Sequence, residues 1–319
     1  MNELWTVRAG QVAYQQARAA QKRLESARQA GEIPDLLLLL EHAPVYTKGR
    51  RSTPDELPMG EDWYRMQGIE VTDTDRGGRV TYHGPGQLVG YPIISLRALS
   101  NRAASGVEGE EAARIDVVDY IRRMEQAIIA ALADWHVEAG LIDGLTGVWT
   151  PARRKVASIG IHVNRGITTH GFAINVNNDL QPFEWIVPCG IEACRVTSLT
   201  RELGAEQDLD AFATTVRDRF AEVYGRTPVE DAFSISSVIG CFSIAIFVPV
   251  CGSSSFGAEI STPGIGPATV GVSGFELLTV SQATVANNAT PTPNPYTIRF
   301  FIGARCCTRF RIGANVPEV

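Results

Sequence analysis

Two side chains in the middle of the sequence have the reactivity needed for nucleophilic catalysis. Cys189 lies between Pro188 and Gly190, a setting typical of a loop in which the sulfur is exposed. Lys155 leads into an apolar, strand-like run and is one of only three lysines in the chain. A cysteine attacks as the thiolate, and a nearby ammonium lowers the pKa of its thiol. Taken alone, each residue also fits a structural role, Cys189 as an inert buried thiol and Lys155 as a solvated strand end.

A glycine-rich segment upstream carries a third chemical signal. Residues 76–92 read RGGRVTYHGPGQLVGYP and hold five glycines within their first fifteen positions. Glycine lets the backbone approach a ligand closely, while Thr81, Tyr82, His83 and Gln87 add hydrogen-bonding groups. The segment lacks the phosphate-loop and dinucleotide-binding glycine patterns, which counts against an ATP-driven ligase. A plain glycine-rich turn between two strands is the structural alternative.

The histidines and cysteines do not form a metal-binding pattern. Cys189 and Cys194 have no second pair at zinc spacing, and Cys306 and Cys307 are adjacent. No two of the five histidines are separated by three residues, and only His83 is expected in a loop among other polar groups. We therefore expect neither a metal nor another cofactor.

The composition is that of a globular protein with an acidic balance. A formal charge of −6 and a pI near 5.5 argue against nucleic acid or an anionic membrane as the main partner. The N-terminus shows no basic region followed by an apolar one, so no secretory signal is expected. Six cysteines in 319 residues are too few for a disulfide scaffold. We therefore expect a cytoplasmic protein with free thiols.

Hydrophobic periodicity predicts the elements that must position these residues. Apolar residues recur at helical spacing over residues 10–30, 115–136 and 208–225, whereas Leu36–Leu40 is typical of a buried strand. Alternation over residues 155–176, interrupted by an Asn-Arg-Gly turn, predicts a β-hairpin. Helices mixed with strands indicate an α+β or mixed α/β architecture.

Three local predictions complete this picture. EHAPVYTKGR, residues 41–50, is expected to be a loop, and a helix is expected to begin at Thr197 or Ser198. In the helix over 115–136, the expected buried face consists of Ile115, Val118, Ile121, Ile128, Leu132 and Trp135.

After Ala232 the sequence changes character. Residues 233–319 contain no lysine, four arginines and three glutamates, with many Ser, Thr, Gly and Pro residues. Short runs such as Phe242–Val250 and Ala268–Val272 are typical of strands, although so few charges also fit a poorly ordered segment. We therefore expect a catalytic domain over residues 1–230 and a C-terminal extension without assigned function over 231–319.

Four segments together resemble the lipoyl(octanoyl) transferase family: RGGRVTYHGPGQLVGYP, RRKVASIGIHV, THGFAINVNNDL and IVPCGIEACRVTSL. EHAPVYTKGR fits the same family, and the resemblance spans about residues 4–228. It implies the fold of the biotin protein ligase and lipoate ligase catalytic domains. That fold is a mixed α/β domain with a large mixed sheet, a smaller sheet and flanking helices, here followed by the low-charge extension.

The resemblance implies an acyltransferase that moves an octanoyl group from acyl carrier protein to a lysine of a lipoyl domain. Cys189 would form the acyl thioester, and Lys155 would lower the pKa of the cysteine and shuttle protons. The implied acceptors are lipoyl domains of 2-oxoacid dehydrogenase E2 subunits and the glycine cleavage H protein. The residues implied to line the acyl-substrate site are Arg76, Gly77, Gly78, Arg79, Val80, Thr81, Tyr82, His83, Ser158, Ile159, Gly160, Gly171, Phe172 and Ala173.

Three alternatives remain open at this point. They are an ATP-dependent lipoate or biotin ligase on the same fold, a thioesterase-like cysteine hydrolase with His83 as its base, and a non-catalytic module that binds lipoyl domains. For the transferase, we expect oxyanion donors among the backbone N–H groups of the glycine segments and of Gly190. The candidate walls of an acyl tunnel are Ala157, Ile159, Phe172 and Ile174.

Overall fold

The computed structural model describes residues 2–99, 117–187 and 195–230, and the short ranges 256–262, 265–272 and 299–300. The chain divides into two compact units, Met1–Cys241 and Phe242–Val319. Among the described residues, no helix combines the length and apolar character needed to cross a membrane.

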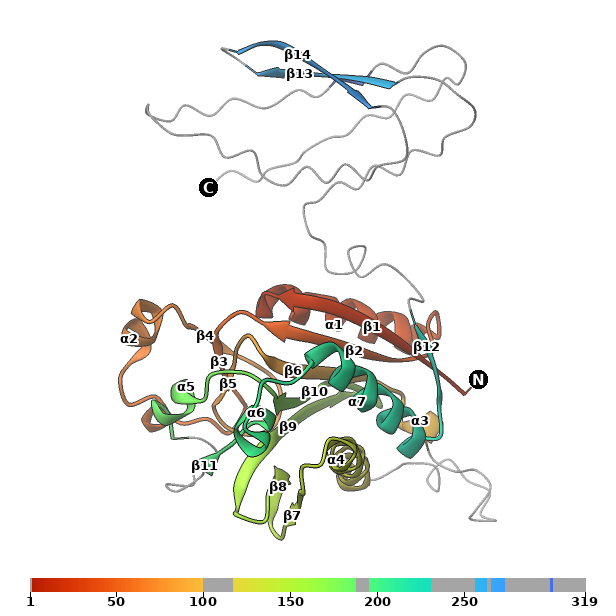
Figure 1. Cartoon of the computed structure of the whole chain (residues 1–319). Helices are drawn as coiled ribbons and strands as arrows, with labels where there is room; N and C mark the ends of the chain where they lie inside the picture. The colour runs from red at the N-terminus through yellow and green to blue at the C-terminus, as the bar shows by residue number, and fades with distance from the viewer. Residues whose placement is uncertain are drawn as a thin grey trace. The chain divides into compact units, whose positions relative to one another are not determined.

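Nine strands of the first unit's described residues form one mixed sheet (Figure 1). Its order is β12-β1-β2-β6-β10-β9-β8-β7, and β11 pairs with β9 beside this path. The pairings of β1 with β2 and β12 and of β11 with β9 are parallel, and the others are antiparallel. The bounds are β1 Glu3–Val12, β2 Asp35–His42, β6 Gln87–Ile93, β7 Gly140–Ile142, β8 Leu145–Trp149, β9 Arg154–Asn164, β10 Ile167–Asn175, β11 Arg195–Val196 and β12 Thr227–Glu230.

Helices cover both faces of this sheet (Figure 1). α1 (Tyr14–Ala30) lies on one face, while α4 (Val117–Asp134) and α7 (Leu209–Val223) pack against each other on the other face. The predicted helix over residues 10–30 is therefore confirmed from Tyr14 onward, because its first residues belong to β1. The shorter helices are η1 Pro54–Glu56, α2 Glu61–Met66, α3 Leu96–Leu99, α5 Gln181–Glu184 and α6 Leu199–Leu203.

The leucine run of β2 shows why the sheet needs two covering layers. Leu37 and Leu39 lie in the core beneath α4 and α7, whereas Leu36, Leu38 and Leu40 lie in the core beneath α1. Successive side chains of a strand point to opposite faces, so an uninterrupted apolar run fits a strand buried on both sides. The predicted buried strand is confirmed.

The predicted buried face of α4 is confirmed in part: Ile128 and Leu132 are buried, and Trp135 packs partly buried against the same core. Its described buried residues include Tyr120, Met124, Ile128 and Leu132, whereas Val118 is 57% exposed. Residues separated by four positions lie one above the other on a helix, so Tyr120, Met124, Ile128 and Leu132 form one stripe. Val118 is offset from that stripe, and Ile115 lies outside the described residues.

The predicted hairpin consists of β9 and β10, and its turn follows the expected chemistry. Arg165 and Gly166 have φ values of +51° and +83°, and Asn164 pairs with Ile167 across them. Two successive positive φ values fit the right-handed twist of the flanking strands. Glycine at the second position has no steric penalty there.

A second, three-stranded sheet corrects the loop prediction for residues 41–50. β3 (Val45–Lys48) pairs in parallel with β4 (Glu70–Asp73) and antiparallel with β5 (Thr81–His83). Thr81 and Tyr82, two of the predicted substrate-site residues, are the β5 partners of Thr47 and Tyr46. The sequence of β3 is short and carries no helical or alternating pattern. Its Tyr46 packs with Tyr82 of β5 in an aromatic core that also includes Tyr64 of α2 and Phe183 of α5.

The second unit contains a separate small sheet in its described residues. β13 (Phe256–Thr262) pairs antiparallel with β14 (Ile265–Val272) and with β15 (Arg299–Phe300). The predicted strand-like run Ala268–Val272 lies within β14. The other predicted run, Phe242–Val250, falls outside the described residues.

Candidate active site

Lys155 lies at the start of β9 and is enclosed by neighbouring strands. It is only 6% exposed, and its Nζ lies 4.9 Å from the centre of the Trp149 ring on β8. On the other side Lys155 pairs with Val196 of β11, and its carbonyl accepts a hydrogen bond from the Thr197 N–H at 2.9 Å. The alternative in which Lys155 is a solvated strand-end side chain is therefore wrong.

A β-bulge decides which face of the sheet Lys155 occupies. Val148 pairs with Ala157, but the next residue of β8, Trp149, pairs with Lys155, so β9 carries one extra residue between these pairs. Val156 and Ala157 both pack in the core beneath α4 and α7. Strict alternation would place Lys155 on that core face together with Ala157. Because of the bulge, Lys155 lies on the opposite face, beside Trp149.

The glycine-rich segment packs directly on that opposite face. The Gly77 N–H donates to the carbonyl of Ile161 at 2.8 Å. A Cβ on Gly160 would lie 2.8 Å from the Gly77 carbonyl oxygen, which real side chains do not tolerate. Glycine at position 160 therefore brings residues 76–80 against the strand that carries Lys155. Because Ile161 already binds the Gly77 N–H, Gly77 is not an open oxyanion donor.

Two polar side chains hold the glycine-rich segment in place. Arg76 is 8% exposed, and its Nη2 donates to the carbonyl and the hydroxyl of Thr47 at 2.6 and 2.7 Å. Glu56 is 1% exposed and accepts hydrogen bonds from Arg79 Nη1 at 2.5 Å and from the Val80 N–H at 3.1 Å. No motif in the sequence pointed to Glu56, because its role depends on a segment more than twenty residues away.

The predicted substrate residues of the hairpin divide between the two faces of the sheet. Ile159 and Phe172 are cross-strand partners, and both pack in the core beneath α4 and α7. Gly171 pairs with Gly160, and a Cβ on Gly171 would lie 2.2 Å from a neighbouring strand's carbonyl oxygen. The four candidate tunnel walls share the α4–α7 face, opposite the face of β9 that residues 76–80 contact: Ala157, Ile159, Phe172 and Ile174. The remaining pair, Ser158 and Ala173, lies on the other face, where Ala173 joins the core beneath α1.

Cys189 and Gly190 fall in residues 188–194, outside the described residues. The chain enters this range at Val187, whose N–H donates to the Glu56 carbonyl at 3.1 Å. It leaves the range at Arg195, which pairs with Arg154 of β9. The end of the cysteine segment is therefore fastened beside Lys155, and the pairing of Cys189 with Lys155 stays a prediction.

An ion pair strengthens this attachment of β11 to β9. Arg154 donates to Glu202 of α6 from Nε at 2.9 Å and from Nη2 at 2.6 Å, and the Thr197 hydroxyl donates to the same carboxylate. Burial opposes ionisation of Glu202, but the hydrogen bonds from Arg154 and Thr197 lower the pKa of its carboxyl. As predicted, α6 begins after Ser198, whose side chain accepts a hydrogen bond from the Arg201 N–H.

His83 is a buried member of a polar network. It is 7% exposed, its Nδ1 bonds Gln87 Oε1 at 2.7 Å, and its Nε2 lies 3.4 Å from Thr47 Oγ1. Gln87 donates to Asn175 at 2.9 Å, and Asn175 donates to the Thr197 carbonyl at 3.0 Å. Burial lowers the pKa of His83 well below its ordinary value. With protein partners on both ring nitrogens, His83 is poorly placed as the base of a hydrolase.

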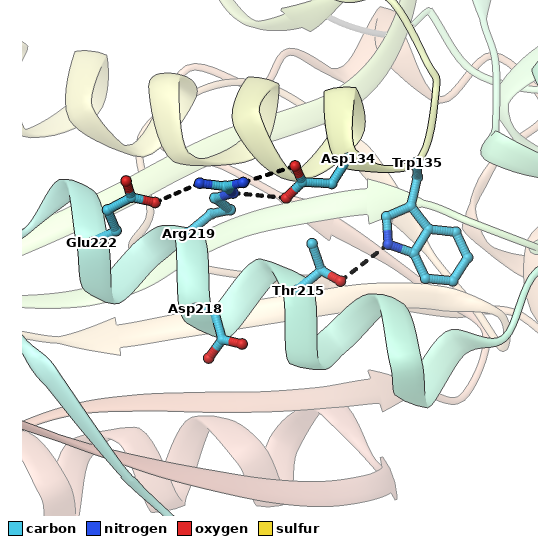
Figure 2. A pocket seen from close by; sticks show the side chains of 6 residues that line it. All are labelled: Asp134, Trp135, Thr215, Asp218, Arg219 and Glu222. Atoms are coloured by element: carbon cyan, nitrogen blue, oxygen red, sulfur yellow. Dashed lines mark hydrogen bonds and ion pairs between the residues drawn. The ribbon is translucent and has the colours of Figure 1, made fainter.

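A surface hollow between α4 and α7 holds none of the predicted site residues. Figure 2 shows Arg219 between Asp134 and Glu222, with the Trp135 indole donating to Thr215. The hydrogen bond from Arg219 lowers the pKa of Asp134. Although Asp134, Asp218 and Glu222 all line the hollow, no cluster suited to a metal ion occurs within the described ranges.

Known proteins resemble this chain in sequence and in fold. Residues 13–221 match the sequence profile of the lipoyl protein ligase A/B catalytic domain. The chain is 47% identical over 225 residues to an octanoyltransferase of Mycobacterium tuberculosis, covering 70% of this chain and 88% of the relative. It is 43% identical over 223 residues to an octanoyltransferase of Acidobacterium capsulatum, covering 68% and 88%. A bipartite lipoate protein ligase from Thermoplasma acidophilum shares the fold, with a TM-score of 0.57 at 17% identity over 75% of this chain and 91% of that one.

Proposed function

The chain belongs to the lipoyl protein ligase A/B catalytic domain family, and on that premise we propose that it is an octanoyltransferase of protein lipoylation. The observation that carries this proposal is the placement of Lys155. It is buried, it lies on the face of β9 that contacts the glycine-rich segment, and it adjoins the strand that leaves the Cys189 segment.

In the proposed reaction Cys189 and Lys155 act in two steps. The Cys189 thiolate attacks the carbonyl carbon of octanoyl-acyl carrier protein, the carbon–sulfur bond to the carrier breaks, and the departing thiolate takes a proton from Lys155. The octanoyl group is then a thioester on Cys189. The amine of the acceptor lysine attacks it, an amide forms, the Cys189 thiolate leaves, and Lys155 takes the proton that the amine loses.

This route needs no ATP, because the enzyme thioester keeps the reactivity of the incoming thioester. The fold alone does not separate transfer from ATP-dependent ligation, since a lipoate protein ligase shares it. The names of the relatives that are more than 40% identical favour transfer. The buried, fully bonded position of His83 argues against a hydrolase that would use it as a base.

The extent of the enzyme and its partners are part of the proposal. We assign catalysis to residues 1–230 and no function to residues 231–319. The acyl carrier protein is the donor, and the lipoyl domains of 2-oxoacid dehydrogenase E2 subunits and the glycine cleavage H protein are the acceptors. The proposed compartment is the cytoplasm, where thiols such as Cys189 stay reduced.

Intact-mass measurement after mixing the full chain with octanoyl-acyl carrier protein tests the proposal. The wild type should gain one octanoyl group, Cys189→Ser should gain none, and the matched control Cys194→Ser should behave as the wild type. Absence of an adduct on the wild type would refute the transferase.

Two further measurements separate the rivals. Exchange of pyrophosphate into ATP in the presence of octanoate would establish a ligase instead. Equal release of free octanoate with and without a lipoyl domain would establish a hydrolase.

A further inference from the structure

A glycine of β8 lies directly against the side chain of Lys155. Gly147 has a φ of +116°, and a Cβ at this position would lie 2.8 Å from Lys155 Cε and 2.6 Å from the Ala157 carbonyl oxygen. Every residue other than glycine is therefore excluded twice, by backbone conformation and by space. The missing side chain leaves the room in which the end of the lysine lies.

The ring of Trp149 forms the other side of that space. Trp149 is 4% exposed, and Lys155 Nζ lies 4.9 Å from the ring centre, within the range of a cation–π contact. An aromatic face stabilises the charged form of a lysine, so Trp149 favours the ammonium that the proposed reaction uses to lower the pKa of the Cys189 thiol.

A buried carboxylate on α4 fixes the position of Gly147. Glu125 has no exposed surface, and its Oε1 accepts the Gly147 N–H at 2.8 Å. Its second oxygen accepts from Arg122 Nη1 at 2.7 Å. A fully buried carboxylate is expensive unless it is paired, and here Arg122 and the Gly147 N–H satisfy one oxygen each, so Glu125 ties the backbone of Gly147 to α4. Gly147 is the residue whose displacement would close the space occupied by Lys155.

We propose that Gly147 and Trp149 together form the binding position, here called the seat, of the Lys155 side chain. Glu125 fixes the position of Gly147 through the hydrogen bond to its backbone N–H. All three are positioning residues for the transfer reaction. The β-bulge of β9 turns Lys155 toward this seat, and the seat sets where its ammonium lies. The inference rests on the proposed function, because it assigns the seat to the proton transfers of Lys155.

The test uses the pH dependence of Cys189 alkylation in the full chain, followed by mass mapping of the Cys189 peptide. Trp149→Phe keeps an aromatic face and should stay within about twofold of the wild-type rate at neutral pH. Trp149→Leu removes the face and should slow alkylation about thirtyfold, the rate equivalent of a desolvated cation–π contact. Its profile should also move to higher pH. Trp135→Leu, a matched tryptophan removal between α4 and α7, should leave the profile unchanged.

A second pair of variants tests the role of Glu125 independently. Glu125→Gln keeps an oxygen that can accept the Gly147 N–H and should retain the wild-type profile. Glu125→Leu fills the same space without an acceptor and should move the profile as Trp149→Leu does. Tryptophan fluorescence identifies any variant that fails to fold, and the conclusion then comes from the other pair.

The outcomes separate the seat from the proposed function. Wild-type profiles for folded Trp149→Leu and Glu125→Leu, beside a displaced profile for Lys155→Ala, would overturn the seat and leave the transferase intact. An equal displacement in Trp135→Leu would also overturn it. An unchanged profile in Lys155→Ala would instead refute the role of Lys155 in the proposed reaction.

Discussion

Acid should destabilise the first unit through a buried histidine that does not belong to the reaction. His42 has no exposed surface, its Nδ1 lies 2.8 Å from the Val12 carbonyl, and its Nε2 lies 2.6 Å from the Tyr91 hydroxyl. Because a carbonyl only accepts, Nδ1 carries the proton and Nε2 accepts from Tyr91. This arrangement needs the neutral ring, and burial lowers the pKa of His42 to about 4.

The size of the effect follows from the difference between the folded and unfolded states. A histidine in the unfolded chain has a pKa of about 6.5, so between pH 6.5 and 4 the unfolded state binds more protons than the folded state. The free energy of unfolding therefore falls as the pH falls through this window. Relative to pH 7, linkage lowers the free energy of unfolding by about 2 kcal/mol at pH 5 and by about 3 kcal/mol at pH 4 from His42 alone. Burial also lowers the pKa values of His83 and His170, which add to the same slope.

Urea unfolding at pH 7 and pH 5, followed by tryptophan fluorescence, measures this loss. All five tryptophans lie within residues 5–185, so the signal reports the first unit. His42→Gln should be less stable than the wild type at pH 7 but should lose about 2 kcal/mol less on going to pH 5. The exposed His136 provides the control, because His136→Asn should keep the wild-type loss. Equal losses in wild type and His42→Gln would show that the burial of His42 does not govern the acid response.

Further predictions concern packing, the cysteine segment and the extension. Gly90→Ala should lower the free energy of unfolding in urea by about 3 kcal/mol, because its Cβ would lie 2.1 Å from the Phe172 ring. Rescue of the stability by Phe172→Leu would confirm that cause, and an unaltered unfolding midpoint would contradict it. Asp35→Ala should lower the free energy of unfolding by about 3–5 kcal/mol in the same assay, because Asp35 is buried and forms ion pairs with Arg28 and Arg226. A decrease below about 1 kcal/mol would show that these ion pairs do not stabilise the fold. Glu202→Gln should slow octanoylation of Cys189 severalfold in single-turnover mass measurements without unfolding the protein, and a wild-type rate would show that the ion pair with β9 does not matter to the site. Truncation after residue 230 should leave octanoyl transfer intact. Complete loss of activity in a folded truncated protein would show that the catalytic domain extends beyond residue 230.

The elements with strong local signals were predictable from sequence alone. The leucine run of β2 and the alternating hairpin of β9 and β10 appear as expected, because strand periodicity follows from burial on each face. α7 begins as its sequence predicts, with Asp208 accepting a hydrogen bond from the Ala211 N–H. In each case the information lies within a few consecutive residues.

The features that place Lys155 were not predictable in this way. A one-residue bulge in β9 depends on its pairing with β8, and no local pattern in the β9 sequence marks it. No sequence pattern marks Glu125, which is fully buried in α4 and accepts the Gly147 N–H of a different element. β3 was expected to be a loop because four residues between a proline and a glycine carry little periodicity, and its partners come from distant segments.

The glycine-rich segment first posed a choice between a simple turn and a ligand-binding surface, and its packing makes the two interpretations compatible. A Cβ on Gly49 would lie 2.4 Å from the Gly78 carbonyl oxygen, and a Cβ on Gly160 would lie 2.8 Å from that of Gly77. Glycines outside the segment thus admit its backbone from two sides, onto β9 and onto the residue that follows β3. A larger residue at either position would push residues 76–80 away from the face that carries Lys155. The same close packing that makes the segment a structural turn therefore also brings its backbone to the proposed acyl-transfer site.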